Sequence, residues 1–162
     1  MERKFPLFTQ VLQDKVFRFA WRLLESKEDA KDVVQDVFEK LWTKKDELKT
    51  HLNIDALIIK ITRDICLDRL KHQQMKRQKL KLLAHEKDPD QKTNYDVYEL
   101  AEITKKLISN LPEKQKMAIH LRDVEQYEYN EISEILEMDI ATIRMNLSRA
   151  RRTIREQLQN IE

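Results

Sequence analysis

The 162-residue chain contains no glycine and only three prolines. Glycine is the usual residue where the backbone turns tightly with a positive φ, and tight β-hairpins depend on it. A sheet-rich fold would therefore lack its ordinary turn residues, and a glycine-rich phosphate-binding loop is excluded. With 41% hydrophobic and 37% charged residues, the composition predicts an all-α protein with modest hydrophobic cores.

The chain has one cysteine, Cys66, in an apolar stretch, so no disulfide can form within it. We expect Cys66 to be a small buried side chain and the protein to work in a reducing cytoplasm. No apolar run approaches the roughly 20 residues that a membrane-spanning helix needs. The charged N-terminus also lacks the apolar core of a signal peptide. The sequence therefore predicts a cytoplasmic protein without membrane insertion.

Signs of catalysis are scarce. The histidines show no metal-ligand spacing with Cys66, and no serine stands in a nucleophile setting. Asp29, Asp32 and Asp36 share one helix face, but no histidine stands beside them in the sequence. We therefore expect no catalytic residue, no metal and no cofactor, and a protein that is not an enzyme.

Apolar residues recur at helical spacing along most of the chain. They predict helices at about Leu7 to Leu24, Asp29 to Trp42, Ile54 to beyond Leu70, Leu100 to Leu107, Glu113 to Gln126 and Glu128 to Glu137, followed by a basic helix. The helix from Glu113 to Gln126 is expected to bury Met117, Leu121 and Val124. The polar stretch from Thr43 to Asn53 is expected to be a loop or a frayed turn. The sequence thus predicts two small helical domains, residues 1–82 and 97–162, joined by a flexible linker over residues 83–96.

The segment from Ile140 to Arg155 contains no carboxylate and follows an acid-rich stretch. Its basic residues are Arg144, Arg149, Arg151, Arg152 and Arg155. At helical spacing, one stripe is apolar and consists of Ile143, Leu147, Ala150, Ile154 and Leu158. The opposite face is small, polar and cationic, with Ala141, Thr142, Met145, Ser148, Arg149 and Arg152. One face is therefore predicted to pack, and the other to meet a polyanion.

Only Met138 and Asp139 separate this basic helix from the predicted helix before it. Two short helices joined by a tight turn, the second of them basic, indicate a helix-turn-helix whose recognition helix enters the DNA major groove. Asp139 is positioned to cap the basic helix, because its carboxylate can accept hydrogen bonds from free backbone N–H groups. The predicted C-terminal domain is therefore a DNA-binding domain.

Two separated stretches resemble bacterial sigma-70 family factors. Asp29 to Trp42, DAKDVVQDVFEKLW, resembles their second-region helix, and Leu111 to Arg152 resembles their fourth region. The short spacing between the two resembles the extracytoplasmic-function (ECF) group. The resemblance implies an RNA polymerase sigma factor that binds core polymerase and directs promoter-specific initiation by recognising minus-35 and minus-10 elements.

Two other functions fit the residues. A stand-alone helix-turn-helix regulator would bind a two-fold DNA site as a symmetric dimer, with the N-terminal half serving dimerisation or sensing. A scaffold that mimics a sigma factor without initiating transcription would have the same fold.

The resemblance also implies partners and sites. The second-region helix would dock on the beta-prime clamp helices of core polymerase through Asp32, Gln35, Asp36 and Glu39. Further expected partners are the polymerase beta flap, promoter DNA and an anti-sigma protein.

The minus-10 element would be read by the loop after that helix and by the helix beyond it. The matching candidates are His51, Asn53, Lys60, Arg63, Asp64, Lys71, Lys76 and Arg77. The family pattern has a tryptophan where Leu57 stands and an asparagine where Asp64 stands. An aspartate replaces two donors with an anion, which puts base reading at position 64 in question. His51 and Asn53 are candidates to line a pocket for a flipped base.

The minus-35 element would be read by the recognition helix. The matching candidates are Thr142, Arg144, Met145, Ser148 and Arg149, with Arg152 and Arg155 nearer the DNA backbone and Tyr129 and Asn130 on phosphates. Met145 is a candidate for a thymine methyl, and an alanine substitution that left promoter preference unchanged would count against this contact. The family's usual glycines are replaced by Gln126 and Glu137, and a left-handed backbone costs a non-glycine residue about 1–2 kcal/mol.

Overall fold

A computed structural model describes residues 8–83 and 100–161. Within these ranges the chain forms helices joined by short turns and contains no β-strand, which confirms the all-α prediction. None of the described helices combines the length and the apolar composition of a membrane span. The predicted linker lies almost entirely outside the described residues.

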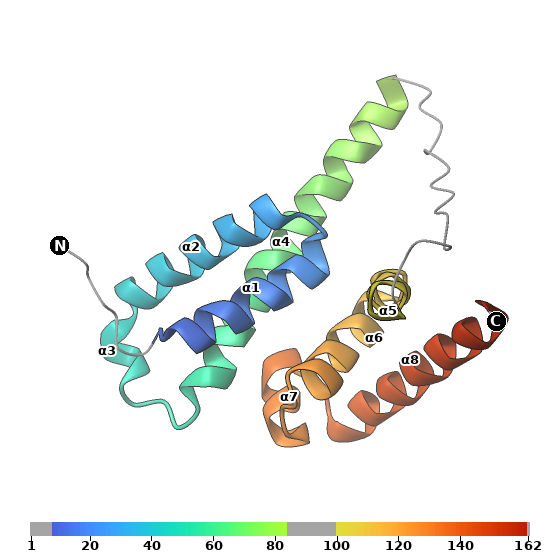
Figure 1. The fold of residues 1–162 in the computed structure, drawn as a ribbon. Coiled ribbons are helices and arrows are strands. Elements are labelled where there is room, and N and C mark those ends of the chain that lie inside the picture. Colours follow the sequence, from blue (N-terminus) through green and yellow to red (C-terminus); the bar gives the residue numbers. More distant parts are fainter. Residues whose placement is uncertain (1–7, 84–99, 162) are drawn as a thin grey trace.

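The first half of the chain consists of α1 (Gln10–Leu24), α2 (Lys27–Thr43), α3 (Lys45–Leu48) and α4 (Ile54–Leu83). In Figure 1, α1, α2 and the first part of α4 form a bundle. Its core includes the fully buried side chains of Val16, Phe19, Val33 and Ile58. In α1 and α2 the apolar residues that recur at helical spacing are the ones that pack.

Side-chain caps set where the first two helices begin. The hydroxyl of Thr9 accepts a hydrogen bond from the Leu12 N–H at 3.3 Å, and that of Ser26 accepts one from the Asp29 N–H at 3.2 Å. Such caps satisfy backbone donors that have no partner inside the helix. For this reason α1 begins at Gln10 rather than near Leu7, and α2 begins at Lys27 rather than at Asp29.

The stretch from Thr43 to Asn53, predicted as a loop or a frayed turn, contains the single helical turn α3. This turn places Leu48 in the core with 2% of its surface exposed, whereas Leu52 is fully exposed. The amide oxygen of Asn53 then accepts a hydrogen bond from the Ala56 N–H at 3.1 Å. Asn53 therefore caps α4, a structural role that we did not predict from the sequence.

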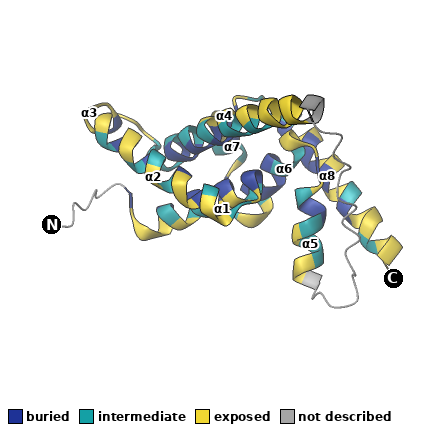
Figure 2. Ribbon diagram, turned by 90° about the horizontal axis from the view of Figure 1, so that it is seen from above, coloured by how far each residue is buried: buried dark blue, intermediate teal, exposed yellow. Residues whose placement is uncertain are grey.

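Helix α4 is buried along its first part and exposed along its second. From Lys71 to Leu80 nearly every side chain is exposed. Figures 1 and 2 show this second part projecting beyond the bundle. The projecting arm carries Lys71, Lys76, Arg77 and Lys79 and no acidic residue, so it is a cationic surface.

The second half consists of α5 (Leu100–Ser109), α6 (Glu113–Ile119), the π-helical turn η2 (His120–Val124), α7 (Tyr129–Leu136) and α8 (Ile140–Ile161). We predicted one helix from Glu113 to Gln126 with Val124 buried, but its last turn is a π-helix and Val124 is 42% exposed. The Glu125 N–H bonds the His120 carbonyl five residues back, at 3.0 Å. The wider turn changes the helical register, which places His120 and Leu121 inward and turns Val124 outward.

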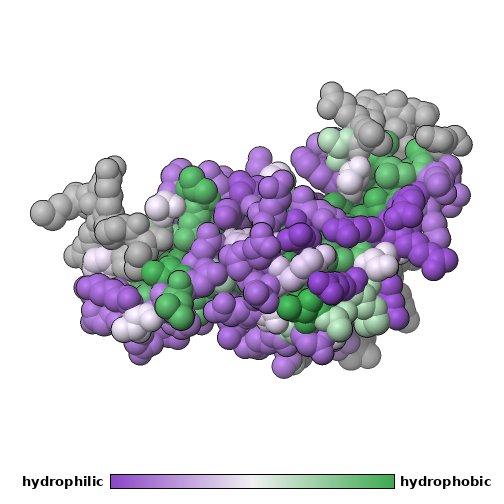
Figure 3. All heavy atoms as spheres, turned by 90° about the horizontal axis from the view of Figure 1, so that it is seen from below, coloured by the Kyte–Doolittle hydropathy of each residue, from purple (hydrophilic) through white to green (hydrophobic). Residues whose placement is uncertain are grey.

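The two halves are packed together. Helix α1 contacts α6, and α4 contacts α7. Figure 3 shows one face of the molecule, on which hydrophilic residues dominate and hydrophobic patches are small. The buried hydrophobic residues of the two halves belong to one core cluster. The contact between the halves, which was not predicted from the sequence, also contains hydrogen bonds and ion pairs that involve candidate site residues.

Candidate nucleic-acid and polymerase interfaces

Helices α7 and α8 form the predicted helix-turn-helix. A carboxylate oxygen of Asp139 accepts a hydrogen bond from the Thr142 N–H at 2.8 Å, so Asp139 caps α8 as predicted. This bond lowers the pKa of the Asp139 carboxyl below its usual value. The predicted apolar stripe of α8 is buried from Ile143 to Ile154, and Leu158 is half-buried.

The opposite face of α8 is open to solvent. Among its candidates, Arg144, Met145, Ser148, Arg149, Arg152 and Arg155 are exposed, and Thr142 is half-buried. Arg152 pairs with Glu156 one turn further along the same helix, at 3.0 Å. Within the described residues, neither Arg149 nor Arg155 has an acidic partner. The cationic face therefore remains available to an anionic ligand.

Tyr129 lies at the start of α7 and is held by two arginines. The guanidinium carbons of Arg122 and Arg144 lie 4.4 Å and 5.1 Å from the centre of its ring. Such cation–π contacts orient long side chains. Tyr129 is half-buried, whereas Asn130 beside it is exposed. The packing therefore positions Arg144 as well as Tyr129 at the edge of the recognition face.

Both positions at which the family pattern has glycine adopt a left-handed backbone. Gln126 has a φ of 61° and Glu137 a φ of 55°. The turn between α7 and α8 thus keeps the geometry that glycine would favour, although Glu137 occupies it. The Ser133 hydroxyl donates to the Met138 carbonyl at 2.6 Å, which helps to close this turn.

The candidate polymerase surface lies on the outer face of α2. Asp32, Gln35 and Glu39 are exposed, and Asp36 is half-buried and accepts a hydrogen bond from Arg69 at 2.7 Å. Helix α2 packs mainly on α1, α3 and α4. The acidic face is therefore open while the two halves are packed together.

The minus-10 candidates fall into two groups. His51, Asp64, Lys71, Lys76 and Arg77 are exposed. The carboxylate of Asp64 accepts two hydrogen bonds from the neighbouring Arg63, at 3.0 Å and 2.6 Å. Asp64, which places a negative charge within the cationic surface, is thus paired with Arg63.

The other group consists of Asn53, Lys60 and Arg63, and all three bond the second half. The Asn53 amide donates to Glu131 at 3.2 Å, and Lys60 lies 2.8 Å from a carboxylate oxygen of Glu137. Arg63 is only 8% exposed. The helix-turn-helix therefore covers this part of the candidate minus-10 surface.

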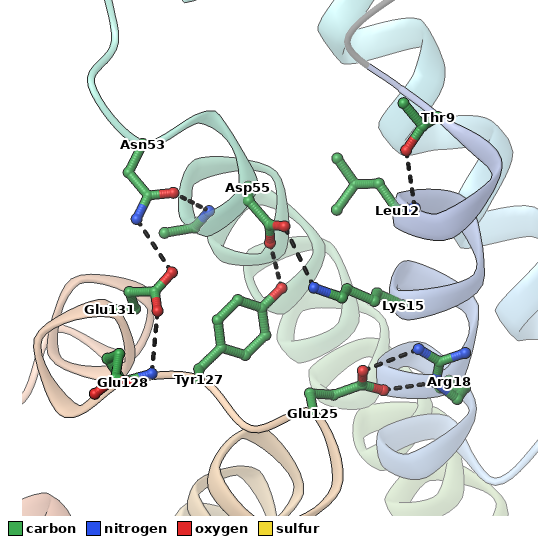
Figure 4. A network of polar contacts seen from close by, with 11 residues as sticks. Thr9, Leu12, Lys15, Arg18, Asn53, Asp55, Glu125, Tyr127, Glu128 and Glu131 are labelled. Carbon is green, nitrogen blue, oxygen red and sulfur yellow. Dashed lines mark hydrogen bonds and ion pairs between the residues drawn. The ribbon is translucent and has the colours of Figure 1, made fainter.

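More charged groups meet between the halves, as Figure 4 shows. Arg18 of α1 donates two hydrogen bonds to the carboxylate of Glu125, at 2.6 Å and 2.9 Å. Asp55 at the start of α4 accepts hydrogen bonds from Lys15 and from the Tyr127 hydroxyl. We predicted no role for these residues from the sequence. The one signal for them in the sequence is the acid-rich stretch of the second half, which meets basic residues of the first.

A buried histidine lies at the centre of this contact. His120 is 1% exposed, its ring lies 5.7 Å from that of Phe19, and its Nδ1 accepts a hydrogen bond from Arg22 at 3.2 Å. Its Nε2 lies 3.5 Å from a Glu125 oxygen. Burial lowers the pKa of His120 below its usual value. Burial alone would raise the pKa of Glu125, but the hydrogen bonds from Arg18, with His120 close by, hold it at about 2.

The lowered pKa of His120 predicts a pH-dependent stability. The unfolded chain takes up a proton at His120 near the usual histidine pKa, and the folded chain does so only at lower pH. The contribution of neutral His120 to the free energy of unfolding is therefore present in full above about pH 6.5. It is lost as the pH falls below that value, because the unfolded chain then binds the proton more readily than the folded chain. Between pH 6.5 and 5 we expect the free energy of unfolding to decrease with a slope of at most about 1.4 kcal/mol per pH unit from this group.

Urea unfolding at a series of pH values measures this slope. The groups facing His120 are Arg18, Arg22 and Glu125, and none of them changes charge in that pH window. A His120→Gln variant should therefore lose the slope, and a variant of the exposed His72, His72→Gln, should keep it. An equal slope in His120→Gln and wild type would contradict the assignment.

Comparison with known proteins gives consistent matches. Residues 8–75 match a family model described as Sigma-70 region 2, and residues 101–154 match one described as Sigma-70, region 4. The ECF RNA polymerase sigma factor SigW of Bacillus subtilis is 22% identical over 97% of this chain and 90% of the relative. The ECF RNA polymerase sigma-E factor of Haemophilus influenzae is 28% identical over 98% of this chain and 89% of the relative.

A solved structure shares the arrangement of the helices. It is the sigma factor RpoE in complex with the anti-sigma factor NepR from Bartonella quintana. The match has a TM-score of 0.75 and 26% sequence identity, and it covers 92% of each chain. The likeness thus extends over both halves of the chain.

Proposed function

Because this chain belongs to the ECF group of the sigma-70 family, we propose that it binds core RNA polymerase and directs initiation at promoters with particular minus-35 and minus-10 elements. The observation that carries this proposal is the pair of open surfaces on opposite halves, the acidic face of α2 and the cationic face of α8. A stand-alone regulator would need only the second surface. The proposed mechanism is non-covalent: the chain bridges polymerase and promoter and leaves when elongation begins.

The fourth-region half would read the minus-35 element. The exposed face of α8 would enter the major groove, where an arginine can donate two hydrogen bonds to a guanine. Arg144 and Arg149 are the candidates for this contact, Thr142, Met145 and Ser148 would line the same groove, and Arg152, Arg155, Tyr129 and Asn130 would hold phosphates.

The second-region half would hold the minus-10 element. Lys71, Lys76 and Arg77 on the projecting arm of α4 would attract the DNA backbone. Lys60 and Arg63 would join them once the second half moves away. Asn53 remains a candidate for base contact, but its capping bond to Ala56 restricts its side chain. We place the two working domains at residues 1–82 and 97–162, with residues 83–96 as their linker.

A charge reversal on α2 tests the polymerase surface. The double variant Asp32→Lys with Glu39→Lys should weaken binding to core polymerase about 10- to 100-fold, because like charges opposed across an interface cost several kcal/mol. The loss should shrink at high salt, since exposed charges are screened. The affinity is measured by fluorescence anisotropy of the labelled chain.

The matched control changes the net charge equally at exposed acids outside α2, one in α1 and one in α3. Asp14→Lys with Glu47→Lys should leave the affinity for core polymerase within about threefold of wild type, as expected for charges outside an interface. If both double variants weakened binding alike, the acidic face of α2 would not be the docking surface.

A regulatory partner is also part of the proposal. The similar RpoE was solved with the anti-sigma factor NepR, and we propose that a protein of this kind holds the present chain inactive. The beta flap of polymerase is the proposed partner of the fourth-region half.

A further inference from the structure

The turn of the helix-turn-helix is bonded to the first half of the chain through Glu137. One carboxylate oxygen of Glu137 lies 2.8 Å from Nζ of Lys60, and the other lies 3.3 Å from Nη2 of Arg63. Arg63 also donates a hydrogen bond of 2.6 Å to the backbone carbonyl of Ile135, at the end of α7. Two cations of α4 are thus held by one turn of the other half.

Glu137 stands at a backbone position that does not favour it. Its φ of 55° and ψ of 42° lie in the left-handed region, where a glycine is accommodated without steric cost. A glutamate there provides a carboxylate for Lys60 and Arg63. Their hydrogen bonds lower the pKa of Glu137 below its usual value.

This contact covers one candidate binding surface and leaves two others open. Arg63 is 8% exposed and Lys60 is half-buried, whereas the acidic face of α2 and the cationic face of α8 are exposed. DNA phosphates could reach Lys60 and Arg63 only by displacing Glu137 and α7. Glu137 therefore competes with a phosphate for Lys60 and Arg63, and Arg63 also bonds the neighbouring Asp64.

We propose that Glu137 is an autoinhibitory latch, which holds the two halves together in the free chain and keeps Lys60 and Arg63 from minus-10 DNA. This inference rests on the proposed function, because it takes α4 as a DNA-binding helix. The closed chain can still present its α2 face to polymerase. The latch opens when promoter DNA competes with Glu137 for the two cations.

The first test measures closure without DNA. Cysteines introduced at Lys31 in α2 and Gln157 in α8 carry a dye pair, and single-molecule energy transfer gives the ratio of open to closed molecules. Both positions are exposed. The native Cys66 is fully buried and burial raises the pKa of its thiol to about 12, so it should not react with the dyes.

Two substitutions release the latch by different routes. Glu137→Gln removes the charge, and Glu137→Gly removes the whole side chain while favouring the left-handed turn. Each should raise the open-to-closed ratio about three- to tenfold, as expected for the loss of two partly exposed ion pairs. The control Glu134→Gln makes the same change in net charge at an exposed residue of α7 and should leave the ratio unchanged. An unchanged ratio in both Glu137 variants would overturn the proposal.

The second test measures the affinity for a forked oligonucleotide with an unpaired minus-10 strand, in the presence of core polymerase. The affinity for this oligonucleotide should rise in the Glu137 variants by about the same factor as the open-to-closed ratio. It should stay unchanged in Glu134→Gln. A raised ratio with unchanged affinity would show that closure does not inhibit DNA binding, which also overturns the proposal. Failure of the sigma function itself would appear differently, as a wild-type chain that gives no initiation with core polymerase.

Discussion

Replacing Arg149 with alanine is expected to lower run-off transcription from the promoters this chain selects by roughly 5- to 150-fold. An arginine that donates two hydrogen bonds to a guanine contributes about 1–3 kcal/mol of discrimination. Arg149 is exposed on the outer face of α8, and no acidic partner holds it among residues 8–83 and 100–161. Its guanidinium can therefore enter the groove without first breaking an ion pair.

Arg151 supplies the matched control for this substitution. It lies on the same helix but is turned towards Asp123, with which it forms two hydrogen bonds of 2.6 Å and 3.0 Å. Arg151→Ala should lower transcription by less than about threefold, because exposed ion pairs contribute little. Promoters should be selected from a randomised upstream library with each variant. If Arg149→Ala selected the same minus-35 sequence as wild type with equal efficiency, Arg149 would not read bases.

Replacing Phe19 with alanine should lower the free energy of unfolding by about 3–5 kcal/mol, the usual cost of deleting a large buried aromatic side chain. Phe19 is 1% exposed in α1 and also contacts the ring of His120 in the other half. The cavity would thus lie where the bundle meets the second half. Urea unfolding followed by circular dichroism measures the loss.

Val11 offers a control on the same helix. It is 67% exposed, and Val11→Ala should change the free energy of unfolding by less than about 0.5 kcal/mol, as surface substitutions usually do. Similar losses in Phe19→Ala and Val11→Ala would mean that α1 does not pack as described.

Much of the fold could be predicted because it depends on local patterns. The apolar stripes of α1, α2 and α8 recur at helical spacing, and Asp139 stands directly before the helix that it caps. The exposed face of α8 follows from the same periodicity. In these helices, the spacing of apolar residues at intervals of three or four positions determines which side chains are buried.

What could not be predicted depends on contacts between distant residues. Arg63 has the charge expected of a DNA-binding residue, but it bonds Ile135 and Glu137, more than 70 positions along the chain. The π-turn that moves Val124 outward follows from no local pattern that we recognise, and α3 forms around the single buried side chain of Leu48. The sequence does not distinguish a charged residue that binds DNA from one that forms an ion pair within its own chain.

The most direct test of the sigma function is run-off transcription with purified core RNA polymerase on a library of upstream sequences. We predict initiation well above that of core polymerase alone, from promoters that share asymmetric minus-35 and minus-10 elements. No initiation above that level, combined with tight binding of the chain alone to two-fold symmetric DNA sites, would contradict the account and identify a stand-alone regulator.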